Sequence, residues 1–403
     1  MRAERMAAGG DALARETSGR IVFAGGALPG ELVRVAVTAE KRDFLRGHVV
    51  EVIEPSDDRV QPPCAFVAQG CGGCGWQHAT VAAQARMKAD IVRDALLRTA
   101  HLPDAVVEAG PALPSERFRT SLRMAVDRRG SLGYRRARSH DVVAVDDCLV
   151  AHPLLAEMVG DVRLPGAAEA VLRCGARTGE RLIAWSTAVG GRAGRATAPR
   201  SVRAEGIPPD AATGWSASVT ETVAGHRLRA STRSFFQSSP EAADLLVAEV
   251  RRAAGPALES PARPVVDAYG GVGLFAVAAV PEDGEVILVE SSPDACADAR
   301  HNLAGRRATV VESRVERWSP VDVHLVIADP AREGLGRAGV AVLSATGCDV
   351  LVLVSCDPVS LARDATLLDA DGLRHRSSVV IDPFPHTPHI EVVTRFERVT
   401  VAR

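Results

Sequence analysis

The sequence predicts an α/β chain whose C-terminal part is a doubly wound, mostly parallel sheet and whose preceding parts are rich in β-strands. Its 403 residues exceed what one ordinary core fills, which indicates two or three domains. From about residue 240, apolar strand-like runs alternate with helical patterns, an order typical of a sheet covered by helices. Earlier in the chain, short alternating runs separated by glycine and proline favour small β-rich units.

Residues 1–60 are expected to form the first domain, a small β-barrel. Strand-like runs lie at 21–24, 31–37 and 48–53, and a turn-forming cluster occupies 25–30. An OB-like barrel, a shape often used on nucleic acids, fits this pattern, and any other small β domain fits it equally well.

Residues 61–232 are predicted to form a central domain that starts at the Pro62-Pro63 pair. We expect a helix near 81–98 and a β-meander within 117–147. Further strands are expected at 170–175, 180–187 and 219–237.

Residues 233–403 are predicted to form the doubly wound domain. A helix at 241–254 leads into strands expected at 264–268, 286–290, 309–311, 325–329, 350–354, 377–381 and 389–396. Sheets of this type bind ligands at the carboxyl ends of their strands, so the residues that follow each strand are the first candidates for a site.

The composition is that of an ordinary globular protein, with 46% apolar residues, 24% charged residues and a formal net charge of −2. The N-terminal residues lack the apolar stretch of a signal peptide. Residues 338–361 are interpreted as a helix and a buried strand, so we expect a cytoplasmic protein with no membrane span. Disulfides are therefore not expected among the eight cysteines.

Acidic residues end three of the predicted strands. The first strand, ending at Asp267, runs into a glycine-rich loop, where Gly271 and its neighbours let a ligand approach the backbone. Glu290 ends the next strand and suits two ribose hydroxyls, and Asp329 ends another strand at the same edge. The G-G-x-G spacing differs from the dinucleotide fingerprint and fits S-adenosylmethionine. This combination favours a class I, Rossmann-like methyltransferase domain over other doubly wound domains.

Cys356 follows the apolar strand LVLVS and would lie at the same edge. A buried core cysteine is the plain alternative. Beside a methyl donor, however, a thiolate can add to C6 of uracil and make C5 nucleophilic, after which a general base must remove the C5 proton. Glu391, at the start of the last strand, is the candidate base, while His386 and His389 are interpreted as loop or packing residues.

The chain resembles the bacterial tRNA/rRNA (uracil-5-)-methyltransferases, in particular the 23S rRNA branch with an N-terminal TRAM domain and an iron–sulfur cluster. The resemblance covers essentially the whole chain, including a TRAM-like start from GGDALA to GELVRV. Its motifs are SFFQ at 234–237, DAYGGVGLF at 267–275, VESSP at 289–293, DPAREG at 329–334, SCDP at 355–358 and DPFPHTPHIE at 382–391.

This resemblance implies a role for each matching residue. Cys356 would be the nucleophile and Glu391 the base. The methyl donor would be contacted by Gln237, Tyr269, Glu290 and Asp329, the last also orienting the uracil. Two departures are visible: residues 312–314 offer no counterpart of an Asp or Asn found in several relatives, and SCDP replaces SCNP.

Four cysteines form a predicted metal site, namely Cys64, Cys71, Cys74 and Cys148. Four thiolates can hold zinc or a [4Fe–4S] cluster, and the spacing alone leaves both open. The resemblance favours [4Fe–4S], because VDDC at 145–148 matches the family's distant fourth ligand. The first gap, C-x6-C, is one residue longer than in some relatives.

An arginine-rich stretch at 115–139 predicts an RNA-binding face. It holds eight arginines against only Glu116 and Asp127, and a solvated sheet face is the plain alternative. RNA is the expected partner, with 23S rRNA favoured and tRNA left open; no obligate protein partner is inferred. The rival readings are an amino-methyltransferase, for which DPAR lacks a stacking aromatic residue, and a non-catalytic RNA-binding module with a metal staple.

Overall fold

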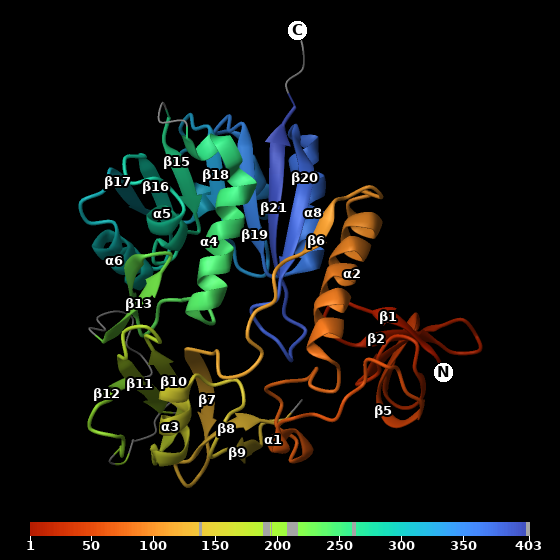
Figure 1. Cartoon of the computed structure of the whole chain (residues 1–403). Coiled ribbons are helices and arrows are strands. Elements are labelled where there is room, and N and C mark those ends of the chain that lie inside the picture. Colours follow the sequence, from red (N-terminus) through yellow and green to blue (C-terminus); the bar gives the residue numbers. More distant parts are fainter. Residues whose placement is uncertain (137–138, 188–193, 195, 208–216, 260–262, 400–403) are drawn as a thin grey trace.

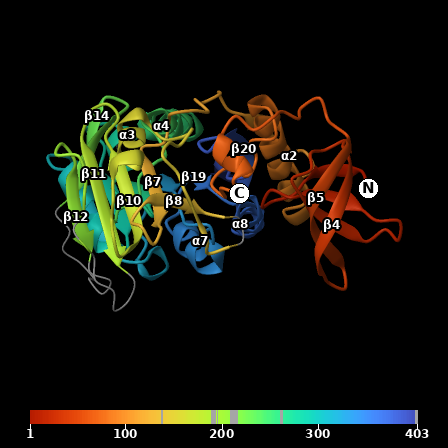
Figure 2. The ribbon, with the colours of Figure 1, turned by 90° about the horizontal axis from the view of Figure 1, so that it is seen from below.

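The computed structural model describes residues 1–136, 139–187, 194, 196–207, 217–259 and 263–399. It contains three larger sheets, which occupy separate parts of the molecule (Figure 1). The N-terminal sheet and the central sheet lie at opposite ends when the molecule is seen from below (Figure 2).

The predicted doubly wound sheet is present and has eight strands. In sheet order they are β17 (Ala308–Glu312), β16 (Val286–Glu290), β15 (Val265–Ala268), β18 (Leu325–Ala328), β19 (Val350–Ser355), β21 (Glu391–Arg398), β20 (Leu373–Ile381) and β6 (Val107–Ala109). The first five are mutually parallel, whereas β21 runs antiparallel to both β19 and β20. The strand order reverses direction at β15 and β18, the place where such sheets bind ligands.

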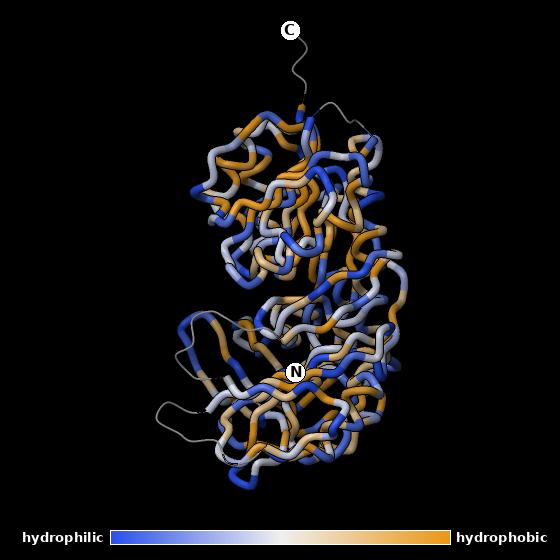
Figure 3. The backbone as a smooth tube through the Cα atoms, turned by 90° about the vertical axis from the view of Figure 1, so that its left-hand side faces the viewer, coloured by the Kyte–Doolittle hydropathy of each residue, from blue (hydrophilic) through white to orange (hydrophobic). Residues whose placement is uncertain are grey.

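Both faces of this sheet are covered, which explains its continuous apolar strands. Successive side chains of a strand point to opposite faces. Leu351 and Leu353 therefore join one core cluster, and Val352 and Val354 join the other. The first cluster packs under α2 (Val81–Thr99), α7 (Gly336–Ser344) and α8 (Pro358–Ala370), and the second under α4 (Pro240–Ala254), α5 (Leu274–Ala278) and α6 (Pro293–Asn302). Figure 3 shows these apolar stretches gathered inside the upper body of the molecule.

The central sheet has six strands and is largely antiparallel. Its order is β12 (Arg203–Ile207), β11 (Arg181–Thr187), β10 (Ala167–Cys174), β7 (Ser121–Val126), β8 (Leu132–Arg135) and β9 (Val142–Ala144), with α3 (Pro153–Asp161) beside it. The region predicted as strand at 219–237 is a hairpin, β13 (Ser218–Val223) and β14 (His226–Ser231). The turn places Ala224 and Gly225 at positive φ, 48° and 85°, as a two-residue hairpin turn requires.

The N-terminal sheet has five strands, of which the sequence predicted three. Its order is β1 (Ala3–Met6), β2 (Ala12–Arg15), β3 (Ile21–Gly25), β5 (Phe44–Glu54) and β4 (Leu32–Glu40). An antiparallel bridge between Arg2 and Leu32 links the two ends of this order. The first and last strands of the sheet are therefore also paired with each other. The short strands β1 and β2 were not predicted, because their sequences have little strand character.

Two elements of the region predicted as the central domain pack elsewhere. The long helix α2 lies against α8, and β6 pairs with β20 as the eighth strand of the C-terminal sheet. Residues 81–109 thus belong structurally to the sheet that carries the candidate site. Residues 338–361 form α7 and β19 as expected, and no helix in the described part of the chain has the length and apolar character needed to cross a bilayer.

Candidate active site

A cavity of about 480 Å³ opens at the carboxyl edge of the eight-stranded sheet. It brings together every residue that the sequence assigned to the cofactor and to the chemistry. These are Gln237, Tyr269, Gly271, Glu290, Asp329, Cys356 and Glu391. They come from the ends of five strands and from the loop before α4, so the predicted juxtaposition exists in the folded chain.

The glycine-rich loop after β15 turns sharply over the cavity. Tyr269 and Gly271 have φ values of 58° and 55°, and Gly273 begins α5 with φ at 88°. A Cβ added to Gly270 would lie 2.6 Å from Leu288, so the chain needs glycine there for packing. No heavy atom lies within 4 Å of a Cβ placed on Gly271, which leaves room for a ligand against the backbone.

Glu290 is fixed by backbone donors around the loop. Its carboxylate accepts hydrogen bonds from the N–H groups of Gly271, Ser291 and Ser292, at 3.1, 2.7 and 2.7 Å. Tyr269 donates its hydroxyl to Glu316 at 3.0 Å, on the single turn η2 (Val315–Arg317). The sequence interpretation stopped at residues 312–314 and therefore missed Glu316.

The antiparallel direction of β21 explains why Glu391 reaches the site. Cys356 follows the last residue of β19, Ser355, and Ser355 is paired with Val392 near the start of β21. The beginning of β21 therefore meets the end of β19 at the same edge. Asp329 follows β18, the next strand along, so the thiol and two carboxyl groups converge on one cavity.

Burial and mutual repulsion disfavour negative charge in this group. Burial raises the pKa of Asp329 to about 7. Burial and the nearby Asp329 raise the pKa of Glu391 well above its ordinary value, and Arg332 opposes this shift. Burial, followed by Glu391 and Asp329, raises the pKa of the Cys356 thiol to about 12. The site is thus suited to a positively charged ligand that would stabilise its anions.

Two polar atoms of the cavity are buried without a partner among the described residues: Oε1 of Gln237 and Oε2 of Glu391. Buried polar groups are normally hydrogen-bonded, so such atoms indicate a place where a ligand donates. Phe235 lies nearby with 66% of its surface exposed, although it also lines the cavity. Its motif, SFFQ, was noted in the sequence, but its aromatic side chain was not assigned.

Arg332 was likewise missed, although it belongs to the DPAREG motif. It lines the cavity, and its Nη2 lies 3.3 Å from Nδ1 of His389. Its loop is held by Asp364 on α8, which accepts hydrogen bonds from the N–H groups of Leu335 and Gly336 at 2.6 and 3.1 Å. The only sequence signal for this placement was its position three residues after Asp329.

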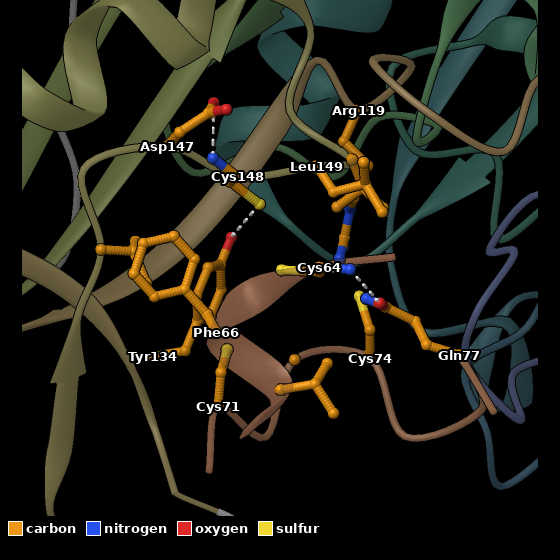
Figure 4. A pocket seen from close by; sticks show the side chains of 14 residues that line it. Cys64, Phe66, Cys71, Cys74, Gln77, Arg119, Tyr134, Asp147, Cys148 and Leu149 are labelled. Carbon is orange, nitrogen blue, oxygen red and sulfur yellow. Dashed lines mark hydrogen bonds between the residues drawn. The ribbon is translucent and has the colours of Figure 1, made fainter. Parts of the chain in front are cut away.

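The four candidate metal ligands, Cys64, Cys71, Cys74 and Cys148, line a second cavity of about 60 Å³ (Figure 4). Three come from the loops around α1 (Ala65–Ala68), and Cys148 follows β9. Among the described residues, no three histidine, cysteine or acidic side chains are grouped as ligands of a single ion. The sulfurs surround a space without converging on one point.

The surroundings of this second cavity fit an anionic group. Arg119 lines it, and its Nε is buried without a hydrogen-bond partner in the described structure. Tyr134 and Cys148 approach to 3.8 Å between Oη and Sγ. Burial raises the pKa of the Cys74 thiol to about 11, and Arg119 acts in the opposite direction. A guanidinium among four thiols is suited to a cluster held by thiolates.

The fold places the arginines of residues 115–139 in different surroundings: some are paired, one lines a cavity and some are exposed. Arg117 pairs with Asp147, and Arg123 and Arg135 both pair with Glu169. Arg119 points into the cysteine cavity, whereas Arg128, Arg129 and Arg136 are exposed. Arg138 lies outside the described residues. Acidic partners from other segments therefore offset part of the charge that the sequence stretch suggested.

Comparison with known proteins places these features in context. No protein-family model matches the chain. The chain is 35% identical to an uncharacterised RNA methyltransferase of Streptomyces coelicolor, over 97% of this chain and 91% of that protein. It is 30% identical to the 23S rRNA (uracil(1939)-C(5))-methyltransferase RlmD of Chromohalobacter salexigens, over 98% of this chain and 89% of that protein.

A solved structure shares the whole architecture. The tRNA (uracil-54, C5)-methyltransferase of Pyrococcus abyssi, crystallised with S-adenosyl-L-homocysteine, matches with a TM-score of 0.74 over 98% of both chains. The sequence identity is 22%, so this likeness shows a common fold.

Proposed function

Because the chain belongs to the RNA (uracil-5-)-methyltransferase family, we propose that it transfers a methyl group from S-adenosylmethionine to C5 of uridine in RNA, with 23S rRNA as the substrate. The observation that carries this proposal is the single cavity that joins the glycine-rich loop, Glu290, Cys356 and Glu391. A cofactor pocket alone would fit any methyl acceptor. A thiol facing a buried carboxyl group fits an acceptor carbon that must first be activated.

Cys356 would begin the reaction by adding its thiolate to C6 of a uracil that has left its stack. The new S–C6 bond moves the electron pair of the C5–C6 double bond toward C5. Bound S-adenosylmethionine supplies an electrophilic methyl group, which C5 takes while the donor sulfur keeps the electrons of the broken bond. Glu391 would then remove the C5 proton, the C5–C6 double bond would re-form, and the sulfur of Cys356 would leave.

The charges of the pocket support this order of events. Burial raises the pKa values of the thiol and the two carboxyl groups, so their ionisation is disfavoured without a nearby cation. A bound sulfonium cation lowers the free-energy cost of anions nearby and so favours the thiolate. Arg332 would assist, since its guanidinium lowers the pKa of both Cys356 and Glu391. The nucleophile would therefore become active mainly when the methyl donor is present.

The remaining cavity residues would bind the two substrates. Glu290 would hold the ribose hydroxyls. The glycine-rich loop with Tyr269 and Gly271 would lie alongside the bound methyl donor. Gln237, with its buried unpaired Oε1, would accept a hydrogen bond from a ligand amine or amide. The exposed ring of Phe235 would offer an extruded base a surface for stacking.

The cysteine cavity would hold a [4Fe–4S] cluster, with zinc as the alternative. A single zinc ion needs four sulfurs each about 2.3 Å from one point. Sulfurs spaced around a cavity instead suit a larger cluster in which each thiolate binds a different iron. Cys64, Cys71, Cys74 and Cys148 would be the ligands, and Arg119 would compensate part of their charge. Iron analysis of anaerobically purified protein tests this assignment, and stoichiometric zinc without iron would refute it.

The other two sheets would bind the RNA around the cavity. We propose that residues 1–60 are a TRAM domain and that the central sheet, within 61–232, presents exposed Arg128, Arg129 and Arg136 to phosphates. Reversing these three charges should weaken RNA binding and lower its salt dependence. Unchanged binding would remove this face from the proposal.

A covalent trap tests the central claim. RNA that carries 5-fluorouridine should leave a stable adduct, because fluorine at C5 cannot be removed as a proton. We expect the adduct to map to Cys356 and to require S-adenosylmethionine, and Cys356→Ala to form none. Methylation by Cys356→Ala would favour an amino-methyltransferase, and a parent protein that binds RNA without methylating it would favour the non-catalytic module. Mass mapping of 5-methyluridine in rRNA and tRNA from a deletion strain separates the two substrates.

A further inference from the structure

The loop that leads into Glu391, residues 382–390, is held by segments that are distant in the sequence. We call it the base loop, and the inference below rests on the proposed function. Its Pro383 carbonyl accepts a hydrogen bond from the Ser238 hydroxyl at 2.8 Å, next to Gln237. Its Pro388 faces the N-terminal sheet so closely that a Cβ added to Gly10 would lie 2.7 Å from it. The placement of Glu391 therefore depends on more than its own strand.

Helix α2 makes the closest polar contacts with the base loop. The buried Gln84 accepts a hydrogen bond from the His386 N–H at 2.6 Å, and its Nε2 lies 3.3 Å from Nδ1 of the same histidine. One turn further along the helix, the fully buried Lys88 donates to Asp382 at 2.5 Å and to the Phe384 carbonyl at 3.2 Å. Gln84 and His386 are 302 positions apart.

Trp76 joins the base loop to the segment that carries the cysteines. Its N–H donates to the His386 carbonyl at 2.8 Å, and its own carbonyl accepts from Nε2 of Gln84 at 3.2 Å. Its indole N–H donates to the Gly10 carbonyl at 3.0 Å. Trp76, Gln84 and His386 thus form one closed set of hydrogen bonds, so a shift of one residue strains its bonds to the other two.

The same segment is tied to the cysteine cavity at its other end. Cys74 lies two residues before Trp76, and Gln77 accepts a hydrogen bond from the Cys64 N–H at 3.0 Å. Arg119, which lines that cavity, also lies over the ring of Phe384 in the base loop, 5.6 Å from its centroid. Two short paths therefore connect the cysteines with the base loop, one through the backbone of Trp76 and one through Arg119.

We propose that Trp76 and Gln84 are positioning residues that tie the filling of the cysteine cavity to the placement of Glu391. When the cavity is filled, the segment after Cys74 is fixed and holds the base loop through His386. When it is emptied, the base loop loosens, and Glu391 moves away from the C5 proton. The affected step is late: the methyl group has been transferred, the S–C6 bond remains, and the C5 proton stays in place until the carboxylate returns.

Hydrogen exchange on the full-length protein measures the loosening directly. We expect the amides of the base loop to exchange roughly five- to tenfold faster in Gln84→Leu, because the His386 N–H loses its buried acceptor and Nε2 of Gln84 no longer donates to Trp76. Gln84→Glu, which keeps the acceptor for the His386 N–H and loses the amide that donates to Trp76 and Ala79, should restore only part of the protection. The matched control is Arg93→Met, which removes contacts of the same helix with Asp90 and Val107 away from the base loop. We expect it to leave base-loop exchange unchanged.

A second arm leaves the chain unaltered and so does not depend on a variant that folds. Metal is removed anaerobically with a chelator, and exchange of the base loop is compared before and after. We expect a rise of the same order as in Gln84→Leu. Unchanged base-loop exchange in either the metal-free protein or Gln84→Leu would overturn the proposal.

A chemical readout separates placement of the base from general damage. With ordinary uridine RNA, Gln84→Leu and metal-depleted protein should accumulate a methylated covalent adduct that is scarcely detected in the parent. Loss of methylation without adduct, with base-loop exchange as in the parent, would overturn the inference while leaving the proposed function intact. A parent protein that never methylates RNA would instead refute the proposed function itself, whatever the exchange results.

Discussion

The candidate active site and the cysteine cavity both contain thiols, but the charged groups around these thiols differ. Burial, followed by the nearby Glu391 and Asp329, raises the pKa of the Cys356 thiol to about 12. Cys74 lies among other thiols with Arg119 nearby, and burial raises its pKa to about 11. Neither environment makes a thiolate unaided. Under the proposed function, each site would form its thiolates only beside a positively charged group, a sulfonium in one case and a metal in the other.

Exchanging single cysteines gives the largest contrast between the two sites. Cys356→Ala should reduce methyl transfer to RNA below detection while leaving the metal content unchanged. Cys74→Ser should lower the metal content while leaving S-adenosylmethionine binding intact. Iron analysis, calorimetric binding and methyl incorporation measured on both variants check this division. If Cys356→Ala lost its metal, Cys356 would also contribute to the metal site, and this assignment of the cysteines would be wrong.

Removing the proposed base is expected to have the next largest effect. Glu391→Gln keeps the shape of the side chain and removes its ability to accept the C5 proton. We expect turnover to fall by about 10²–10⁴-fold, the range typical of a general base. The covalent RNA adduct should still form and should persist on a denaturing gel. Normal turnover by this variant would assign the base to another residue.

The pH dependence of ligand binding tests the charge argument for the Cys356 site. Burial raises the pKa of Asp267 and Asp329 to about 7, so these groups gain negative charge as the pH rises from 6 to 8. A cationic ligand should therefore bind more tightly at pH 8, by roughly tenfold for one pKa unit of coupling. S-adenosylhomocysteine, which lacks the sulfonium charge, is the control. Equal pH profiles for it and the cationic analogue sinefungin in calorimetry would contradict the argument.

The smallest expected effect comes from comparing Arg332 in the active-site cavity with Arg119 in the cysteine cavity. Arg332 lowers the pKa of Cys356 and Glu391, so Arg332→Gln should move the rising limb of the pH–rate profile upward by roughly one unit. Arg119→Gln can change the turnover rate through the base loop, but Arg119 is not among the charges that act on Cys356 and Glu391, so the midpoint of this limb should stay in place. A similar shift in both variants would indicate a general change of the protein rather than a local one.

The sequence predicted that the candidate cofactor residues lie together, because parallel strands bring their carboxyl ends to one edge. Glu290, Asp329 and Cys356 could be placed together without knowing the packing. Phe235 and Arg332 were missed as site residues, because each lies in a recognised motif but reaches the cavity only through the path of its loop. Glu391 was predicted through its motif, whereas the structure explains its position by the reversal of β21.

The parts of the fold that the sequence did not predict also depend on contacts between distant segments. Strands β1 and β2 are only four residues long and contain alanine and arginine in place of β-branched residues. Strand β6 has only three residues, and it forms a strand because it pairs with β20. The contacts of Gln84 with His386 join segments that no local pattern connects. Such long-range pairings follow from the packing of the whole chain.

The narrow clearance at Gly10 limits how this protein can be recombined with its relatives. A side chain there would strike Pro388 and crowd Trp76, so three remote segments must fit one another to less than the width of a methyl group. Exchanging residues 1–60 alone would bring a foreign turn against an unmatched partner. A working hybrid would have to take the turn around Gly10, Trp76 and Pro388 from the same parent. These three contacts therefore have to be exchanged together, although they belong to different parts of the fold.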